Sequence, residues 1–276
     1  MKKSIFLIVF FMFVSSLMAQ NYQKVVITYD RIGDGLYNFY AENPNFYPMQ
    51  ICLDFPDFQN MTATCPLPYV STLEHGKHYL FQVKRVLLDI PGSFKHSFYT
   101  RIGGYPVLYD PNTVYQLPVA KDKPTKALAF DNSKSEEPAK IQWGFSMSKG
   151  DSVLACREGV VCLISEAKTV NGYRTGENSV TILHPDNSFG KYEVLADSST
   201  FVRLGDTVKA GTPLGIAGGE NYQFGAHTRF SVYYVNARID SITNNKIKNF
   251  NTYVDPLFRV GEGKPFTLKA NSEYEN

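Results

Sequence analysis

The chain has 276 residues, of which 43% are hydrophobic and 14% aromatic, and this length and composition suit about two domains with β-rich cores. The 28 basic residues include Lys2 and Lys3, so a mature chain without these two has 26 basic and 26 acidic residues. A chain so balanced lacks the basic face that nucleic-acid binding requires, and this excludes a nucleic-acid partner.

Residues 1–19 have the pattern of a secretory signal peptide. Lys2 and Lys3 form a positive n-region, residues 5–14 an apolar h-region, and Ala19 is a small residue before a cleavage point at Gln20. The apolar run is shorter than the roughly 20 residues that span a bilayer, so we favour cleavage over a transmembrane anchor. We therefore expect a secreted, periplasmic or cell-envelope protein without a stable membrane anchor.

Residues 20–112 are predicted to form an immunoglobulin-like β-sandwich. Turn residues separate stretches rich in β-branched and aromatic side chains, namely KVVITYD, GLYNFYAEN, MQICLDF, YLFQVKRVLL and HSFYTRI. His75 and His78 are interpreted as bracketing a hairpin turn at Gly76 and Lys77. A metal pair is disfavoured, because no acidic or cysteine partner is identifiable.

Four cysteines in an exported chain favour disulfides, and four cysteines allow three pairings. Proximity in sequence suggests Cys52 with Cys65, and Cys156 with Cys162. An equally good interpretation is that all four are small buried thiols.

The second half, residues 113–260, is predicted to be a compact β-sheet domain, because short apolar strands alternate with glycine-bearing turns. Four segments carry a resemblance to the LytM/lysostaphin-type zinc endopeptidases, whose domain has a duplicated hybrid motif. They are GFSMSKGDSVLACREGVVCLI, VTILHPDNSFGKYEVL, RLGDTVKAGTPLGIAGG and GAHTRFSV, in the order and spacing of that family across residues 140–235. The remaining residues, 261–276, form a polar tail that we expect to be disordered at its end.

The resemblance implies a zinc site that this chain has mostly lost. A catalytic zinc needs about three protein ligands and an open position for water. The family's aspartate ligand falls on Gly144 and its last histidine ligand on Arg229, whose guanidinium has no lone pair to donate. The upstream histidine ligand has no candidate, since no histidine occurs between His96 and His184.

Two further family histidines assist catalysis, and only one of them is kept. One position is Val194, and the other is His227, which we interpret as vestigial. Arg229 and Tyr192 are candidate binding residues of the old substrate groove. Glu193 is expected to face away from the groove, because adjacent strand residues point to opposite faces. We expect no metal and no other cofactor.

The leading functional hypothesis is a secreted, non-catalytic LytM-like envelope protein. It would bind peptidoglycan or a cell-wall hydrolase through the vestigial groove, as degenerate members of the family do by analogy. One alternative is an active zinc endopeptidase that cleaves peptidoglycan cross-bridges with an altered ligand set, in which case zinc is the cofactor. A second alternative is a structural envelope module that binds through its N-terminal sandwich.

Overall fold

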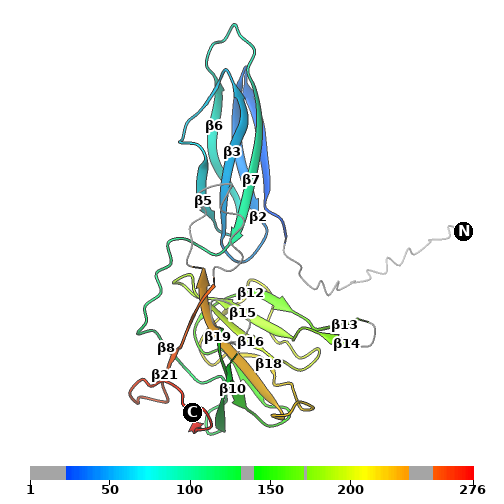
Figure 1. The fold of residues 1–276 in the computed structure, drawn as a ribbon, viewed down its shortest axis with the longest axis vertical. Coiled ribbons are helices and arrows are strands. Elements are labelled where there is room, and N and C mark those ends of the chain that lie inside the picture. Colours follow the sequence, from blue (N-terminus) through cyan, green and yellow to red (C-terminus); the bar gives the residue numbers. More distant parts are fainter. Residues whose placement is uncertain (1–22, 132–139, 171–172, 236–250) are drawn as a thin grey trace, which may run out of the picture.

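The structure, a computed structural model, describes residues 23–131, 140–170, 173–235 and 251–276. The predicted signal peptide lies outside these residues. All the regular elements in the described ranges are β-strands (Figure 1), so the predicted all-β class is confirmed. The same ranges contain no helix that could cross a membrane.

The N-terminal part is a sandwich of two antiparallel sheets (Figure 1). One sheet has the order β1 (Val26–Gly33), β2 (Leu36–Asn43), β6 (Gly76–Arg85) and β4 (Met61–Ala63), and the other has β5 (Tyr69–Leu73), β3 (Met49–Gln59) and β7 (Ser93–Ile102). The two sheets share one core, in which Phe39 and Phe81 from the first sheet meet Ile51 and Leu53 from the second. The first five residues of β3 are all buried, and Met49, Ile51 and Leu53 among them belong to this core.

A nine-stranded sheet organises the C-terminal part. Its main path runs through β17 (Thr207–Val208), β12 (Gly159–Ser165), β15 (Ser179–Leu183), β16 (Phe189–Glu193), β19 (His227–Val235), β10 (Ile141–Ser146), β9 (Pro124–Asp131) and β22 (Glu273–Glu275), and β20 (Asn251–Val254) pairs with β19. Three small sheets accompany it: β11 (Ser152–Leu154) with β18 (Pro213–Ile216), β13 (Lys168–Val170) with β14 (Tyr173–Thr175), and β8 (Val114–Tyr115) in parallel with β21 (Leu257–Phe258).

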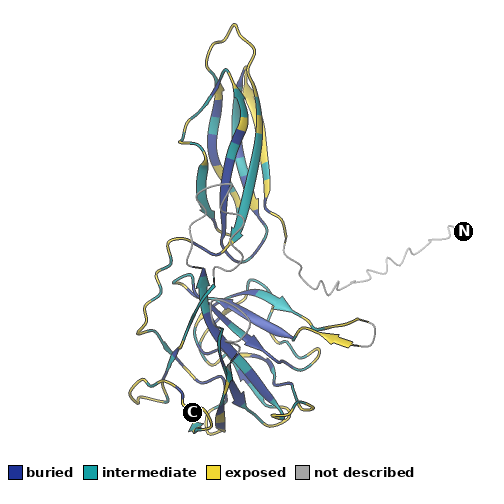
Figure 2. Cartoon of the chain, viewed as in Figure 1, coloured by how far each residue is buried: buried dark blue, intermediate teal, exposed yellow. Residues whose placement is uncertain are grey.

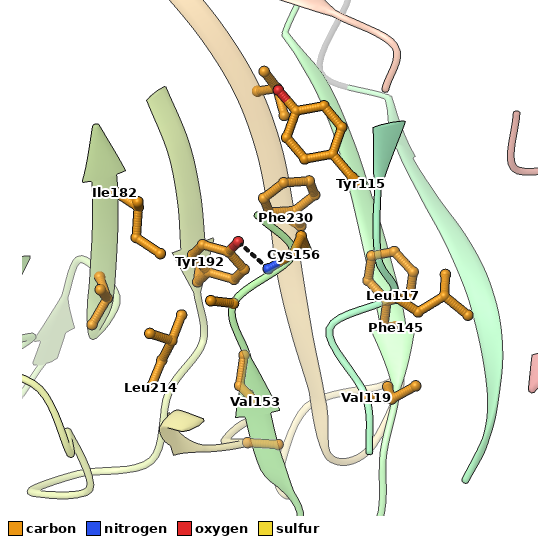
Figure 3. Packing of buried hydrophobic residues seen from close by; sticks show 14 of the residues in the cluster. Tyr115, Leu117, Val119, Phe145, Val153, Cys156, Ile182, Tyr192, Leu214 and Phe230 are labelled. Atoms are coloured by element: carbon orange, nitrogen blue, oxygen red, sulfur yellow. Dashed lines mark hydrogen bonds between the residues drawn. The ribbon is translucent and has the colours of Figure 1, made fainter. Parts of the chain in front are cut away.

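The C-terminal core lies on one face of the large sheet (Figure 3). Phe145 and Phe230 point into it from β10 and β19, and Tyr115 and Leu214 cover them from β8 and β18. The view by burial shows the central strands of this sheet as almost wholly buried (Figure 2). This rigid framework sets the positions of the side chains on the opposite face.

The N-terminal sandwich covers only one end of the opposite face of the large sheet. At one end, Phe189 and Cys162 belong to the core of the N-terminal sandwich, so this end is covered by the sandwich. Lys191 and Glu193 follow Phe189 on the same face of β16, by the alternation of strand residues. The sandwich therefore leaves the other end of this face, where Glu193 lies, for a site.

The suggested disulfides are not formed: none of the four cysteines, all of which are described, is bonded to another. Cys156 belongs to the core on one face of the large sheet and Cys162 to the core on the other, so the sheet separates their thiols. Cys52 alternates with inward-pointing Ile51 and Leu53 on β3, whereas Cys65 packs against the inner core. Cys52, Cys156 and Cys162 are buried free thiols, as the second interpretation expected, whereas Cys65 is only half-buried.

Two further expectations are corrected. The polar tail is not disordered at its end, because β22 pairs with β9 at the edge of the large sheet and Leu268 is buried in the C-terminal core. Its backbone groups bond to that edge, and order follows from pairing. The segment around Gly76 is not a hairpin turn either, since β5 and β6, which flank it, belong to different sheets of the sandwich.

Candidate functional site

The two ligand positions of the family face each other across adjacent strands. Gly144 on β10 is the register partner of Arg229 on β19, and Arg229 is in turn the partner of Glu193 on β16. Their neighbours Phe145 and Phe230 point into the core, so all three positions lie on the opposite face. The two positions that the resemblance assigns to metal ligands are therefore adjacent in the sheet.

A phenylalanine that the motif comparison did not single out fills the space above Gly144. Phe130 comes from β9, which pairs with β10 on the side away from β19. A Cβ built on Gly144 would overlap the Phe130 ring and would lie 3.2 Å from the Cβ of Leu128. No side chain longer than glycine fits at position 144 while Phe130 stays in place. Sequence carried no signal for Phe130, because its strand has no counterpart in the motifs.

Arg229 and His227 form a fixed polar chain against Phe130. The Arg229 guanidinium carbon lies 4.4 Å from the centroid of the Phe130 ring, and the His227 ring stacks on the same phenylalanine at 5.9 Å. Nε of Arg229 donates to Nε2 of His227 over 3.3 Å, and Nδ1 of His227 lies 2.7 Å from the carbonyl oxygen of Gly225.

These two contacts assign the protons on the imidazole. A carbonyl oxygen only accepts, so Nδ1 carries the hydrogen, and Nε2 is then the acceptor for Arg229. Burial lowers the pKa of His227 below its ordinary value, and the nearby Arg229 charge lowers it further. His227 is therefore a neutral, fully buried support for Arg229, and its metal-binding lone pair is occupied.

Val194 lies beside His227 in an unusual backbone conformation. Its φ is +66°, which is in the left-handed region, and this breaks the alternation of β16 just past Glu193. A Cβ built on Gly219 would lie 2.9 Å from Cε1 of His227 and 3.0 Å from Cγ1 of Val194, so all three residues meet at one point. The valine that replaces the family's histidine is thus placed at the site but offers only methyl groups.

Glu193 faces the site, so the expectation that it faces away is wrong. Because of the break at Val194, both Glu193 and Val194 approach the same region. The carboxylate of Glu193 accepts from Lys191 at 2.6 Å and from Lys140 at 3.1 Å, and it also bonds to the amide of Gln142. Burial alone would raise the pKa of Glu193, but the two lysines hold it below its usual value.

Tyr192 is not a groove residue, which corrects its assignment as a binding candidate. It is 0% exposed and belongs to the C-terminal core (Figure 3), where its hydroxyl accepts from the backbone N–H of Cys156 at 2.6 Å. Since Glu193 points to the site, its neighbour Tyr192 must point to the core. Tyr192 is therefore structural.

A pocket of about 230 Å³ lies next to His227. It is lined by backbone and side chains of Arg174, Glu177, Val194, Leu195, Ala196, Asp197, Gly218, Gly219, Glu220, Asn221 and Tyr222. The hydroxyl of Tyr222 donates to the carboxylate of Glu177 at 3.0 Å, and the Tyr222 ring lies 5.8 Å from that of His227. Phe224 contacts both Phe130 and His227 and is half exposed.

The residues at the site do not fit a zinc ion. Gly144 offers no ligand, the guanidinium of Arg229 has no lone pair, and the lone pair of His227 accepts from Arg229. The Phe130 ring occupies the volume that an aspartate at position 144 would need. Within the described residues, no group of three or more His, Cys, Asp or Glu side chains could hold a metal ion.

Comparison with known proteins identifies the fold family of this region. Residues 143–241 match the model of peptidase family M23. The predicted resemblance to the LytM/lysostaphin-type peptidases is thereby confirmed for this segment. A comparison with curated proteins found no match.

Solved structures similar to this chain include three peptidases. The catalytic domain of lysostaphin from Staphylococcus simulans is 23% identical, with a TM-score of 0.29, over 45% of this chain and 84% of that domain. The catalytic domain of a prophage-encoded M23 protein from Enterococcus faecalis is 17% identical, with a TM-score of 0.33, over 43% and 87%. A zinc-containing peptidase from Vibrio cholerae is 13% identical, with a TM-score of 0.36, over 78% and 83%. At these identities and TM-scores, the likenesses say nothing about the activity of this chain.

Proposed function

We propose that this chain is a secreted, non-catalytic member of the M23 family that binds peptidoglycan in the cell envelope. The family acts on peptidoglycan, and the family match covers Gly144, His227 and Arg229. The predicted signal peptide supports export. A non-catalytic role follows from the chemistry of the side chains at the family's ligand positions.

One observation carries the proposal: the Phe130 ring fills the space beside Gly144 and lies against the guanidinium of Arg229, and the resemblance assigns metal ligands to positions 144 and 229. Hydrolysis in this family depends on a zinc-bound water whose pKa the metal lowers. Neither a phenylalanine nor a guanidinium can supply a hydroxide near neutral pH. The scaffold is kept, and the hydrolytic group is replaced.

Zinc content of mature protein, expressed in zinc-supplemented medium and measured by elemental analysis, tests the loss of catalysis. We expect zinc far below one equivalent, and the same value for His227→Ala. About one zinc per chain, lost in His227→Ala, would overturn the proposal and support an active endopeptidase with other ligands. A turbidity assay on purified cell walls, with and without chelator, gives the independent readout of hydrolysis.

Co-sedimentation with insoluble peptidoglycan tests binding. We expect the chain to sediment with the polymer and to remain soluble without it. A chain that stays in the supernatant would contradict peptidoglycan binding and would favour a cell-wall hydrolase as the partner. Residues 20–112, produced alone, should stay in the supernatant, whereas their co-sedimentation would favour the sandwich as the binding module.

A further inference from the structure

The guanidinium of Arg229 is fixed on two sides and open on a third. Its carbon lies over the Phe130 ring, 4.4 Å from the centroid, and its Nε donates to His227. The two terminal nitrogens make no hydrogen bond with any described residue, and Arg229 is half-buried in the structure. A planar guanidinium with its Nε edge occupied still offers the two parallel N–H groups of its Nη edge.

Among the residues that the structure describes, the positive charge of Arg229 also has no ion-pair partner. Glu193 is its register neighbour on β16, yet this carboxylate bonds to Lys191, Lys140 and Gln142. No ion pair joins Arg229 to any described carboxylate. A half-buried cation that no described carboxylate pairs with favours an anion, because a bound carboxylate supplies the opposite charge and the hydrogen-bond acceptors that burial removes.

We propose that Arg229 binds the carboxylate of a peptide through its two terminal nitrogens. This inference rests on the proposed function and names the chemical group that the former peptidase groove receives. Phe130 and His227 hold the guanidinium in one orientation, so little side-chain entropy is lost on binding. The half-exposed ring of Phe224, next to Phe130 and His227, supplies an apolar contact for the neighbouring part of the peptide.

Charge in the adjoining pocket limits where the carboxylate can lie. Glu177, Asp197 and Glu220 line that pocket, and Asp197 and Glu220 pair with Arg174 and Lys149. Glu177 receives only the neutral hydroxyl of Tyr222 among the described hydrogen bonds. A second negative group is therefore unfavourable in the pocket, and the carboxylate is restricted to the Arg229 end.

Calorimetric titration of the full mature chain tests the inference. The probes are N-acetyl-D-alanyl-D-alanine, its C-terminal amide, and N-acetylglutamic acid α-amide, whose only carboxylate is on the side chain. We expect the amidated dipeptide to bind roughly 10- to 100-fold more weakly than the free acid, the factor for a charge-assisted hydrogen-bonded pair. The glutamic acid probe shows whether a side-chain carboxylate serves as well as a terminal one.

Three variants assign the effect to Arg229. Arg229→Gln should lose binding of the free acid by the same factor, and Arg229→Lys should keep part of it, because lysine retains the charge without the planar fork. Lys95→Gln, at an exposed lysine on strand β7 of the sandwich, serves as the control and should bind as the parent does. Thermal unfolding of each variant confirms that it is folded, and a Tm close to that of the parent makes the comparison valid.

The result that overturns the inference is equal affinity for the acid and the amide, or unchanged affinity in Arg229→Gln. Failure of the proposed function looks different. If the chain sediments with peptidoglycan and Arg229→Gln does so equally, the proposed function stands and the carboxylate site is wrong. If the chain binds free acids through Arg229 but never peptidoglycan, the carboxylate site stands and the proposed function is wrong.

Discussion

The guanidinium carbon of Arg229 lies over the ring of Phe130, 4.4 Å from its centroid, and the two side chains come from strands on opposite sides of β10. They reach one another only because the β10 residue between them is Gly144. The contact therefore depends on three residues from three adjacent strands: Phe130, Gly144 and Arg229. An aspartate at position 144 or a smaller residue at position 130 would separate the pair.

Gly144→Ala tests this dependence. The new methyl group overlaps the Phe130 ring and approaches Leu128, so we expect a loss of about 1–3 kcal/mol in the free energy of unfolding. In a Phe130→Ala background the same substitution should cost much less, since the obstacle is gone. Urea denaturation of the four proteins gives the coupling energy. An equal cost in both backgrounds would show that Phe130 does not exclude a side chain there.

Tyr192→Phe separates a structural role from a binding role. The change leaves the buried N–H of Cys156 without its acceptor, which should lower the free energy of unfolding by about 1–3 kcal/mol. Binding to peptides should stay as in the parent, because the ring is in the core. Tyr173→Phe, at a position 77% exposed, is the matched control and should be neutral. Weaker binding with unchanged stability would restore Tyr192 as a groove residue.

Sequence predicted the site well where a residue type alone decides the chemistry. Glycine and arginine cannot bind zinc wherever their side chains point, so the loss at Gly144 and Arg229 followed from their identity. The motifs gave the order of these segments along the chain, and the structure adds that Gly144 and Arg229 are paired in register. Sequence predicts less well the role of a residue that depends on which face of the sheet its side chain points to.

A single backbone angle reversed two assignments. The family motif places Tyr192 and Val194 two residues apart, and simple alternation then puts both at the groove and Glu193 away from it. Because the φ of Val194 is positive, the side chains of Glu193 and Val194 both approach the site although they are adjacent in sequence. Tyr192 therefore points into the core. Nothing in the side chain of a valine signals a left-handed conformation. No sequence motif indicates Phe130, because its position beside the site follows from the pairing of β9 with β10 in the folded chain.

His184 should make stability depend on pH. The residue is buried, its Nδ1 bonds to the carbonyl of Glu158, and its Nε2 has no partner among the described residues. Burial lowers the pKa of His184 to about 4. Because the unfolded chain has a pKa near 6.5, it binds the proton first, so stability is full above that value and falls as the pH drops toward 4.

The expected loss over this window is roughly 3 kcal/mol, because the pKa of His184 is about 4 in the folded chain and about 6.5 in the unfolded chain. Urea denaturation of the parent and of His184→Phe at several pH values between 4 and 7 measures it. The variant should show a flatter profile, whatever its absolute stability. His78→Gln, which alters a half-exposed histidine, should keep the slope of the parent. A parent profile without slope would show that His184 titrates normally.

Asn60 should hold the loop at the far end of the sandwich in place. Its side chain donates to the carbonyls of Leu87 and Ile90 at 2.9 and 2.7 Å and accepts from the N–H of Leu87 at 2.9 Å. The loop, which joins β6 to β7 at the end away from the large sheet (Figure 1), exposes Leu87, Leu88 and Ile90 to solvent. Loss of these bonds should release the loop.

Asn60→Ala removes all three bonds and places alanine at a φ of +50°, so two effects destabilise the chain. Asn60→Gly removes the same bonds without the backbone strain, and it should be the more stable of the two by about 1 kcal/mol. Hydrogen exchange at the Leu87 amide should accelerate in both variants, because both lose its acceptor. Leu88→Ser, at a side chain 72% exposed, should change neither stability nor this exchange rate. Unchanged protection of Leu87 in Asn60→Gly would show that the loop is ordered without the asparagine.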